Sequence, residues 1–348
     1  MTIRGLGRLR RLAQPYTNRF FPGPVVLAYH RVADLASDPQ LLAVTPRHFA
    51  EQVEVLRREG YPVRLLDLIT AVRDGKSLPR GVIVTFDDGY ADNLISAKPV
   101  LERYDVPATV FVTTGYLGGE RDFWWDELDK VLLQYDTLPS TLSLYISGKL
   151  HQWDLSPSAN ACGRGACERR WNISERHDPG PRQSVYRALH RLLRPLHEAE
   201  RRHVLDELTK WVGAGAVPLS DRAALSPAEV IDLAEGDLVE VGSHSVTHPV
   251  FSHLPARAQR VEIERSKSNL EEILGRPVRS FAYPFGAKSD YTEETAGFVA
   301  HAGYLGACAN FPAVVEPTTD RFQLPRFLVR DWGGDEFSRR LGAWLGGN

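Results

Sequence analysis

The chain has 348 residues, of which 43% are hydrophobic and 25% are charged, and its formal net charge is −2. These values are typical of a soluble globular protein with one large domain and an insertion, or with two small domains. Because the charge is nearly balanced, nothing in the composition favours nucleic acid as a partner. Function therefore has to be read from local sites.

Residues 1–22 form a basic segment that carries five arginines and no acidic residue. The segment lacks the continuous apolar run of a signal peptide, and no uncharged apolar stretch of the chain is long enough to cross a bilayer. Two interpretations stay open: a solvated tail, or an amphipathic segment in which Leu6, Leu9 and Leu12 face anionic lipid. We expect a cytoplasmic protein, with peripheral contact at the inner membrane in the second case.

Cysteines are few and irregularly spaced: Cys162, Cys167 and Cys308. This odd set favours a reducing compartment over a disulfide framework. A Cys162–Cys167 bridge stays open as an alternative if the protein is exported.

Residues 23–119 alternate predicted strands with predicted helices. Thr45 before Pro46 predicts a helix start, because a threonine cap and a first-turn proline are both favoured there, and Gly60 ends that helix. A second helix is expected over 93–104. Apolar, β-branched runs typical of buried strands cover 24–30, 81–86 and 108–112. The alternation predicts an α/β fold with a parallel sheet or barrel.

The pattern changes over residues 120–224, where helical spacing of apolar residues predicts a mainly helical insertion. Trp124 and Trp125 in this segment either stack on sugar rings or belong to the core. The α/β pattern resumes over 225–348, with predicted strands at 238–244 and 280–284 on either side of a charged helix at 256–274.

Two acidic residues, Asp87 and Asp88, directly follow the predicted strand 81–86 and precede Gly89. Chemistry in α/β folds collects at the C-terminal ends of strands, where His30 also stands. Adjacent ionised carboxylates repel each other unless a cation or a proton separates their roles. One can therefore bind a metal while the other acts as a base; a surface turn is the alternative.

Two histidines, His244 and His248, follow the predicted strand 238–244. If the chain turns helical there, residues four apart share one face and can bind one cation. With a carboxylate from Asp88 they would form a two-histidine, one-carboxylate site with open positions. Such a cation activates water and polarises a carbonyl group, which is the chemistry of hydrolysis.

These residues resemble the motifs of polysaccharide deacetylases of carbohydrate esterase family 4, which share the NodB-homology domain. Thr85-Phe86-Asp87-Asp88-Gly89 is similar to the first motif, and His244-Ser245-Val246-Thr247-His248 to the second. The resemblance implies a distorted, incomplete (β/α) barrel over roughly residues 24–118 and 225–333. It also implies that Asp87 is the base and that Asp88, His244 and His248 bind a divalent metal, most commonly Zn²⁺.

The third motif is only partly similar. In Ala282-Tyr283-Pro284-Phe285-Gly286, Ala282 stands where the family has an arginine that pairs with the catalytic aspartate. We expect Arg326 to replace it, with Arg279 and Arg330 as alternatives. By the same resemblance Tyr283, Pro284 and Phe285 would line the substrate groove, and the Phe285 N–H would stabilise the oxyanion.

Two further motifs are displaced or weak. Asp331-Trp332 is similar to an Asp-Trp pair of the groove, with a surface turn packed on the core as the alternative. The family's late strand with an acid histidine is missing, since no histidine follows His301. We expect His30 to be the general acid, as in circularly permuted members that act on exopolysaccharides. The alternative is that His30 only caps its strand through a backbone hydrogen bond.

The sequence thus predicts a metal-dependent hydrolase that removes the N-acetyl group from an amino-sugar polysaccharide, oligosaccharide or lipid-linked glycan. An O-deacetylase and an inactive glycan-binding module with the same fold are the alternatives. A serine hydrolase is not supported, because the chain has no Gly-x-Ser-x-Gly elbow.

Overall fold

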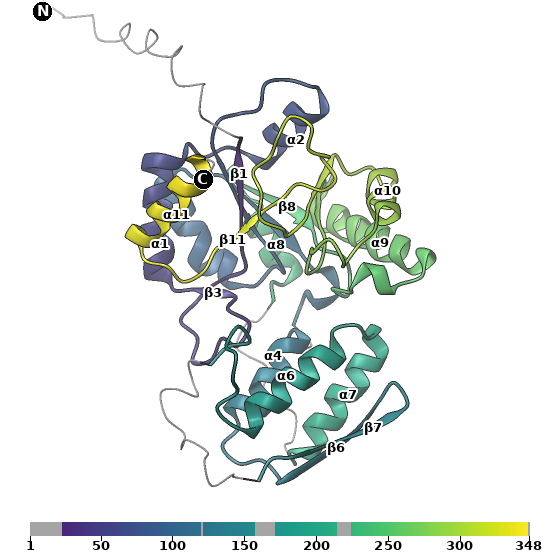
Figure 1. Ribbon diagram of the computed structural model, residues 1–348. Helices are drawn as coiled ribbons and strands as arrows, with labels where there is room; N and C mark the ends of the chain where they lie inside the picture. Colours follow the sequence, from purple (N-terminus) through teal and green to yellow (C-terminus); the bar gives the residue numbers. More distant parts are fainter. Residues whose placement is uncertain (1–22, 120, 157–170, 214–223, 347–348) are drawn as a thin grey trace, which may run out of the picture.

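The computed structural model describes residues 23–119, 121–156, 171–213 and 224–346. Its centre is a curled, all-parallel sheet with the strand order β10-β9-β8-β5-β4-β1-β11, which forms a half-barrel (Figure 1). The predicted distorted, incomplete barrel is therefore confirmed. The strands are β1 (Val25–Tyr29), β4 (Val82–Phe86), β5 (Ala108–Val112), β8 (Val239–Ser243), β9 (Ser280–Ala282), β10 (Gly306–Cys308) and β11 (Phe327–Leu328).

Helices cover the outside of the sheet (Figure 1). The prediction at Thr45 is confirmed, since its side chain accepts a hydrogen bond from the His48 N–H at the start of the first helix. None of the described helices is both long and apolar enough to span a membrane. The helices of the half-barrel are α1 (Pro46–Val55), α2 (Leu65–Arg73), α3 (Lys98–Tyr104), α8 (Pro227–Leu233), α9 (Ala256–Leu274), α10 (Glu293–His301) and α11 (Gly334–Gly346).

Strand β1 sits inside the sheet rather than at its edge. It pairs in parallel with β4 on one side and with β11 on the other, so the first described strand lies beside one of the last. Tyr29 is in register with Phe86, and His30 and Asp87 follow them at the same level of neighbouring strands. A short parallel pair, β2 (Arg31–Val32) and β3 (Ala43–Val44), continues from the end of β1.

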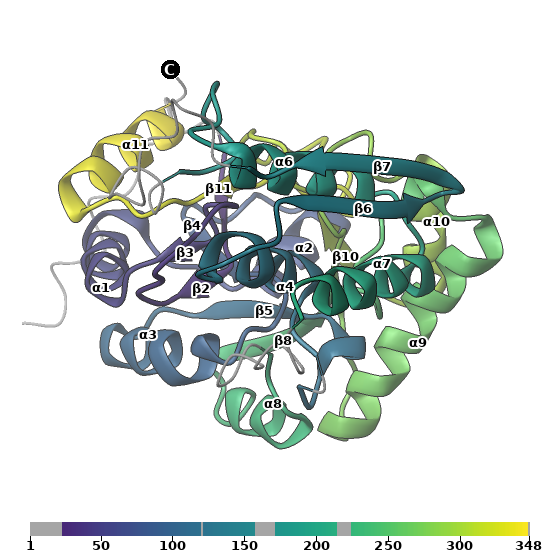
Figure 2. The ribbon, with the colours of Figure 1, turned by 90° about the horizontal axis from the view of Figure 1, so that it is seen from below.

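The segment predicted as a mainly helical insertion forms its own layer under the C-terminal ends of the strands (Figures 1 and 2). It contains α4 (Trp124–Asp129), α6 (Pro181–Leu193) and α7 (Glu198–Trp211) around a separate apolar core. An antiparallel hairpin of β6 (Thr141–Ile146) and β7 (Lys149–Asp154), which the sequence analysis did not predict, packs against α7. The boundaries of the insertion at residues 120 and 224 stay a prediction.

Some predictions fall outside the described residues. These are the basic segment 1–22, with its proposed membrane contact, and the pair Cys162 and Cys167. Cys308 is described, and it is a buried free thiol in β10.

Candidate active site

The two aspartates stand where β4 ends, on a backbone that bends sharply. Asp88 has a φ of 73°, which costs a residue with a side chain about 1–3 kcal/mol. Gly89 follows with a φ of 81°, and a Cβ there would lie 3.1 Å from Val112 Cγ1. The strained turn directs the carboxylates of Asp87 and Asp88 to the C-terminal edge of the sheet, and both are almost fully buried.

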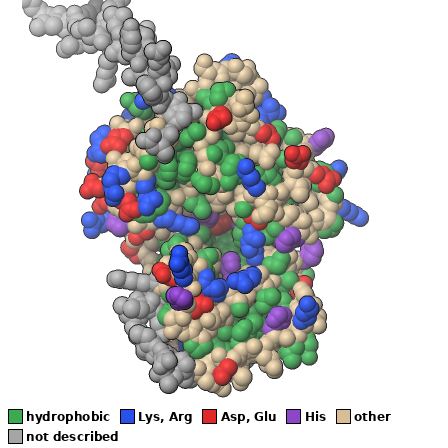
Figure 3. All heavy atoms as spheres, in the orientation of Figure 1, with side chains coloured by type: hydrophobic (Ala, Val, Ile, Leu, Met, Phe, Trp, Pro, Cys, Tyr) green, Lys and Arg blue, Asp and Glu red, His purple; other side chains and the backbone are tan. Residues whose placement is uncertain are grey.

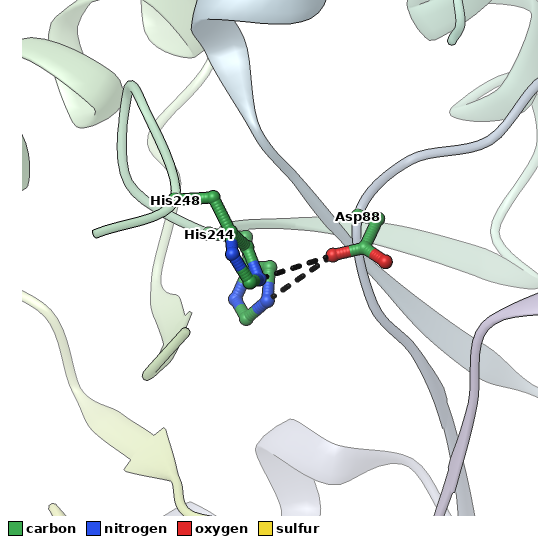
Figure 4. Close-up of side chains that lie close together, drawn as sticks. All are labelled: Asp88, His244 and His248. Carbon is green, nitrogen blue, oxygen red and sulfur yellow. Dashed lines mark ion pairs between the residues drawn. The ribbon is translucent and has the colours of Figure 1, made fainter. Parts of the chain in front are cut away.

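Asp88, His244 and His248 converge, as the sequence predicts (Figure 4). Asp88 Oδ1 lies 3.5 Å from His244 Nε2 and 3.3 Å from His248 Nε2. One ligand atom from each of the three residues can be chosen so that all lie within 4.8 Å of one another. Asp88 Oδ1 is buried without a hydrogen-bond partner in the described part of the chain, so its lone pairs are available to a cation.

A turn, and not a helix, brings the two histidines together. After β8 the chain makes a bend in which Ser245 has a φ of 68° and His248 a φ of 55°. The chain therefore does not turn helical here, and the two imidazoles converge through the bend instead. The Ser245 hydroxyl accepts a hydrogen bond from the His248 N–H at 3.0 Å, which closes the bend.

The histidines are suited to bind a metal because their environment keeps them neutral. Burial lowers the pKa of His244, and burial together with the nearby Arg201 charge lowers the pKa of His248 to about 3. His244 Nδ1 contacts the Ala282 carbonyl oxygen at 2.8 Å, which fixes the tautomer that leaves Nε2 free. Two neutral imidazoles and one carboxylate are a fitting donor set for a divalent cation such as zinc.

Arg326 meets Asp87 in a bidentate pair. Its Nη1 and Nη2 atoms donate to Asp87 Oδ1 and Oδ2, each at 2.7 Å, and its Nε donates to the Ala309 carbonyl oxygen. Burial alone would raise the pKa of Asp87, but the Arg326 charge and hydrogen bonds outweigh it and hold that pKa well below its usual range. Arg326 thus occupies the place expected of the arginine that Ala282 does not supply.

The third motif divides into a buried part and an accessible part. Tyr283 is fully buried, stacks on Tyr291 and donates its hydroxyl hydrogen to the Phe322 carbonyl oxygen. The Tyr283 side chain therefore packs in the core, and its expected place in the substrate groove stays a prediction. Pro284 is buried too.

Phe285 is half-buried and lies against the metal-ligand group. Its ring meets the His248 ring edge-on at 4.7 Å, and the guanidinium of Arg194, the residue that follows α6 in the insertion, lies 4.3 Å from the centroid of the Phe285 ring. Its φ of 60° holds the backbone in the left-handed region. Its suggested role as an N–H donor to the oxyanion stays a prediction.

His30 lies close to the aspartates. Burial lowers its pKa, while the charges of Asp88 and Asp87 act in the opposite sense. Its carbonyl oxygen accepts a hydrogen bond from Asn93, but its ring makes no hydrogen bond to any residue in the described ranges. The ring is therefore not engaged in capping its own strand, and its role as the acid stays a prediction.

Asp331 and Trp332 contact the helices behind the site. Asp331 Oδ1 accepts hydrogen bonds from the Thr45 N–H and hydroxyl at the start of α1, and it pairs with His48. Trp332 packs on Trp344 of α11. Within the described residues, no contact joins either of them to the metal-ligand group, and their place in a groove stays a prediction.

Trp125, one of the two tryptophans already singled out in the sequence, touches the site, and so do two residues that sequence reasoning missed, Arg201 and Glu262. Trp125 is buried in the insertion core, and its ring also meets the His248 ring at 4.8 Å. Arg201 of α7 and Glu262 of α9 both bind the backbone between His244 and His248. Nothing in the sequence marks Arg201 or Glu262, because each belongs to an ordinary amphipathic helix.

The chain is similar to several known deacetylases. The curated poly-β-1,6-N-acetyl-D-glucosamine N-deacetylase of Escherichia coli K12 is 36% identical over 97 residues, which are 27% of this chain and 14% of that protein. Among solved structures, IcaB from Ammonifex degensii superposes with a TM-score of 0.57 at 21% identity, covering 93% of this chain and 97% of its own. The Streptococcus pyogenes deacetylase PplD, in complex with acetate, gives 0.56 at 16% identity and covers 92% of this chain and 98% of its own.

These two structures show the fold, and the sequence match shows the family. The sequence pattern of the family described as polysaccharide deacetylase matches residues 74–134 and 180–304, more than half of the chain. The match extends into α4, α6 and α7, which the sequence analysis had placed outside the resemblance, and the unmatched stretch between its two parts holds the β6–β7 hairpin. The chain belongs to the polysaccharide deacetylase family.

Proposed function

We propose that the protein is a metal-dependent hydrolase that removes the acetyl group from an N-acetylated amino-sugar polymer, oligosaccharide or lipid-linked glycan. The observation that carries the proposal is the adjacency of two sites, the Asp87–Arg326 pair and the Asp88, His244 and His248 group. The E. coli relative is named for this reaction on poly-β-1,6-N-acetyl-D-glucosamine, although this chain spans only a small part of its length.

Each side chain takes one part of the reaction in this proposal. Asp87 accepts the proton of the attacking water, because Arg326 keeps its carboxylate ionised and leaves one lone pair on each oxygen free. Asp88, His244 and His248 hold the cation, which we take to be Zn²⁺ and which supplies Lewis-acid polarisation of the acetyl carbonyl when bound. The Phe285 N–H helps to bind the oxyanion, and His30 protonates the leaving amine.

A cavity beside the site supports access for a sugar. It encloses about 190 Å³ between residues 34–42 and α4, and it is lined by Trp125, whose ring also contacts the His248 ring. Figure 3 shows this face of the molecule hollowed where the insertion meets the half-barrel. We propose that the glycan approaches between the two layers.

An O-deacetylase and an inactive glycan-binding module are the competing functions. The binding module draws its support from the missing arginine at Ala282, and the Arg326–Asp87 pair weakens that support. An O-deacetylase would use the same side chains, so only the substrate separates it from the N-deacetylase.

Acetate release decides among these functions. The chelator-stripped protein, reloaded with Zn²⁺ or Co²⁺, is incubated with N-acetylated and O-acetylated oligosaccharides matched in length, with the D87N variant as a blank. We expect metal-dependent release from the N-acetylated series. Release from the O-acetylated series alone would assign the O-deacetylase, and binding without release from either would assign the binding module.

A further inference from the structure

The turn that carries His248 is held by hydrogen bonds from two separate layers. On the half-barrel side, the Ser245 and Val246 carbonyl oxygens accept from the N–H groups of Thr114 and Gly115. The Glu262 carboxylate accepts from the Val246 and Thr247 N–H groups, each at 2.8 Å. The Thr247 carbonyl, next to the metal-ligand residue, is bound by the insertion instead.

That bond comes from Arg201 of α7. The side chain is fully buried, its Nη2 donates to the Thr247 carbonyl oxygen at 2.9 Å, and its Nε donates to Glu198 at 3.1 Å. Its Nη1 has no hydrogen-bond partner in the described part of the chain. A buried guanidinium with an unsatisfied donor is a poor choice for stability alone, so a role at the turn accounts for it better.

The two histidines also differ in how they are fixed. His244 is fixed through its ring, by the Nδ1 contact with the Ala282 carbonyl oxygen. His248 Nδ1 is buried and finds no partner among the described residues. The orientation of His248 therefore depends on its left-handed backbone and on the neighbours that hold that backbone, Arg201 among them.

We propose that Arg201 is a positioning residue of the metal site, and that the insertion thereby completes the metal centre and does more than shape access to it. Arg201 fixes the Thr247 carbonyl, which sets the backbone of His248 and aims its Nε2 at Asp88. Trp125 of α4 packs on the same imidazole and supports it from the insertion as well. The inference rests on the proposed function, since it concerns the same cation.

Arg202 offers a matched control. It lies one residue further along α7, donates from Nε to the same Glu198 carboxylate and pairs with Glu127, but it has no contact with the 245–248 turn among the described residues. A methionine at either position keeps the apolar stem and removes one guanidinium from the same ion network.

The test measures metal affinity and stability of the full chain. Zn²⁺ affinity is determined by competition with a chromophoric chelator, the site is probed through the visible absorption of bound Co²⁺, and thermal unfolding of the metal-free proteins is followed in parallel. We expect R201M to bind Zn²⁺ about 10–100-fold more weakly, the range for outer-shell partners of metal ligands, with an altered Co²⁺ spectrum. R202M should unfold at about the same temperature as R201M. It should bind Zn²⁺ as tightly as the wild type.

A second variant covers the case in which R201M does not fold. In R201K the ammonium can bind either Glu198 or the Thr247 carbonyl but cannot span both as the guanidinium fork does, so affinity should fall between that of the wild type and the 10–100-fold loss. A Zn²⁺ affinity equal to that of the wild type in R201M would overturn the inference; if R201M does not fold, the same result in R201K would do so. An equal loss of Zn²⁺ affinity in R202M would also overturn it. If the wild type itself bound neither Zn²⁺ nor Co²⁺, the proposed function would fall first.

Discussion

Arg326 and Asp87 are 239 residues apart in the chain and meet through two hydrogen bonds of 2.7 Å each. Arg326 is fully buried, and its side chain also donates hydrogen bonds to the Ala309 carbonyl oxygen and the Thr85 hydroxyl, so its guanidinium has no freedom to turn away. The pair couples the end of β4 to the segment that leads into β11.

Replacement of Arg326 should move the pH dependence of catalysis. In R326M the burial that raises the pKa of Asp87 is no longer opposed by the arginine charge. The carboxylate then protonates at higher pH, and the acidic limb of the kcat/KM profile should shift upward by about 1–3 pH units. The profile is measured from pH 4 to 9, with R279M, at an exposed position, as the control. An unshifted limb would remove Arg326 from the tuning of the base.

The D87N variant separates base from ligand. An amide in place of the carboxylate cannot accept the proton, so turnover should fall by about 10²–10⁴-fold. Bound metal, measured by elemental analysis, should stay at the wild-type ratio, because Asp88 and the histidines are intact. Loss of metal in D87N would show that Asp87 is a ligand as well.

Removal of His248 should cost the metal. H248A leaves Asp88 and one imidazole, and we expect metal content and activity to fall together after dialysis against a weak chelator. H253A is the control, since His253 is exposed and lies five residues beyond His248. Stoichiometric metal in H248A would take that histidine out of the ligand set.

His30 can be tested by changing the leaving group. An amine must be protonated as it leaves, whereas an aryl oxide leaves without help, so H30A should lose far more activity on an acetamide than on an aryl acetate. The ratio of the two rates is measured at saturating metal. Equal losses on both substrates would contradict the role as general acid.

Substitution of Trp332 tests whether this residue lines the substrate groove or only packs on the core. Because its ring packs on Trp344 and under Arg340, W332A should lower the free energy of unfolding by about 1–3 kcal/mol and leave KM unchanged. Urea unfolding and KM on one oligosaccharide are compared with W344A, which removes the other half of the same contact. A KM raised in W332A but not in W344A would instead support the predicted place of Trp332 in the groove.

Features of the fold and the site could be predicted where the type of a residue and its position in the sequence determine its place in the structure. Asp87 and Asp88 end an apolar run, so their place at the edge of a parallel sheet follows from the strand alone. The helix 256–274 was predicted to its ends because its charged, amphipathic pattern is continuous. Arg326 was expected from a missing arginine at Ala282, and the structure brings it to Asp87.

Other features depend on contacts that no local pattern records. The bend at His248 requires left-handed residues that are not glycine, and besides the local Ser245 hydroxyl it is held by distant partners such as Glu262. Tyr283, which the resemblance places at the groove, is buried and stacks on Tyr291, a contact that its motif does not reveal. The β6–β7 hairpin has one apolar face on β6, but β7 is largely exposed, so its pattern was too weak to predict a strand.

The parallel pairing of β1 with β11 also has a consequence during synthesis. Leu27 is in register with Phe327, so the ribosome must have made residue 327 before the sheet can close around β1. Until then Asp87 lacks its partner Arg326. The nascent chain can already contain Asp88, His244 and His248, but the pKa of the proposed base Asp87 is not yet lowered by the arginine. Contacts of such long sequence separation form late. Hydrolytic competence should therefore be the last property that the newly made protein acquires.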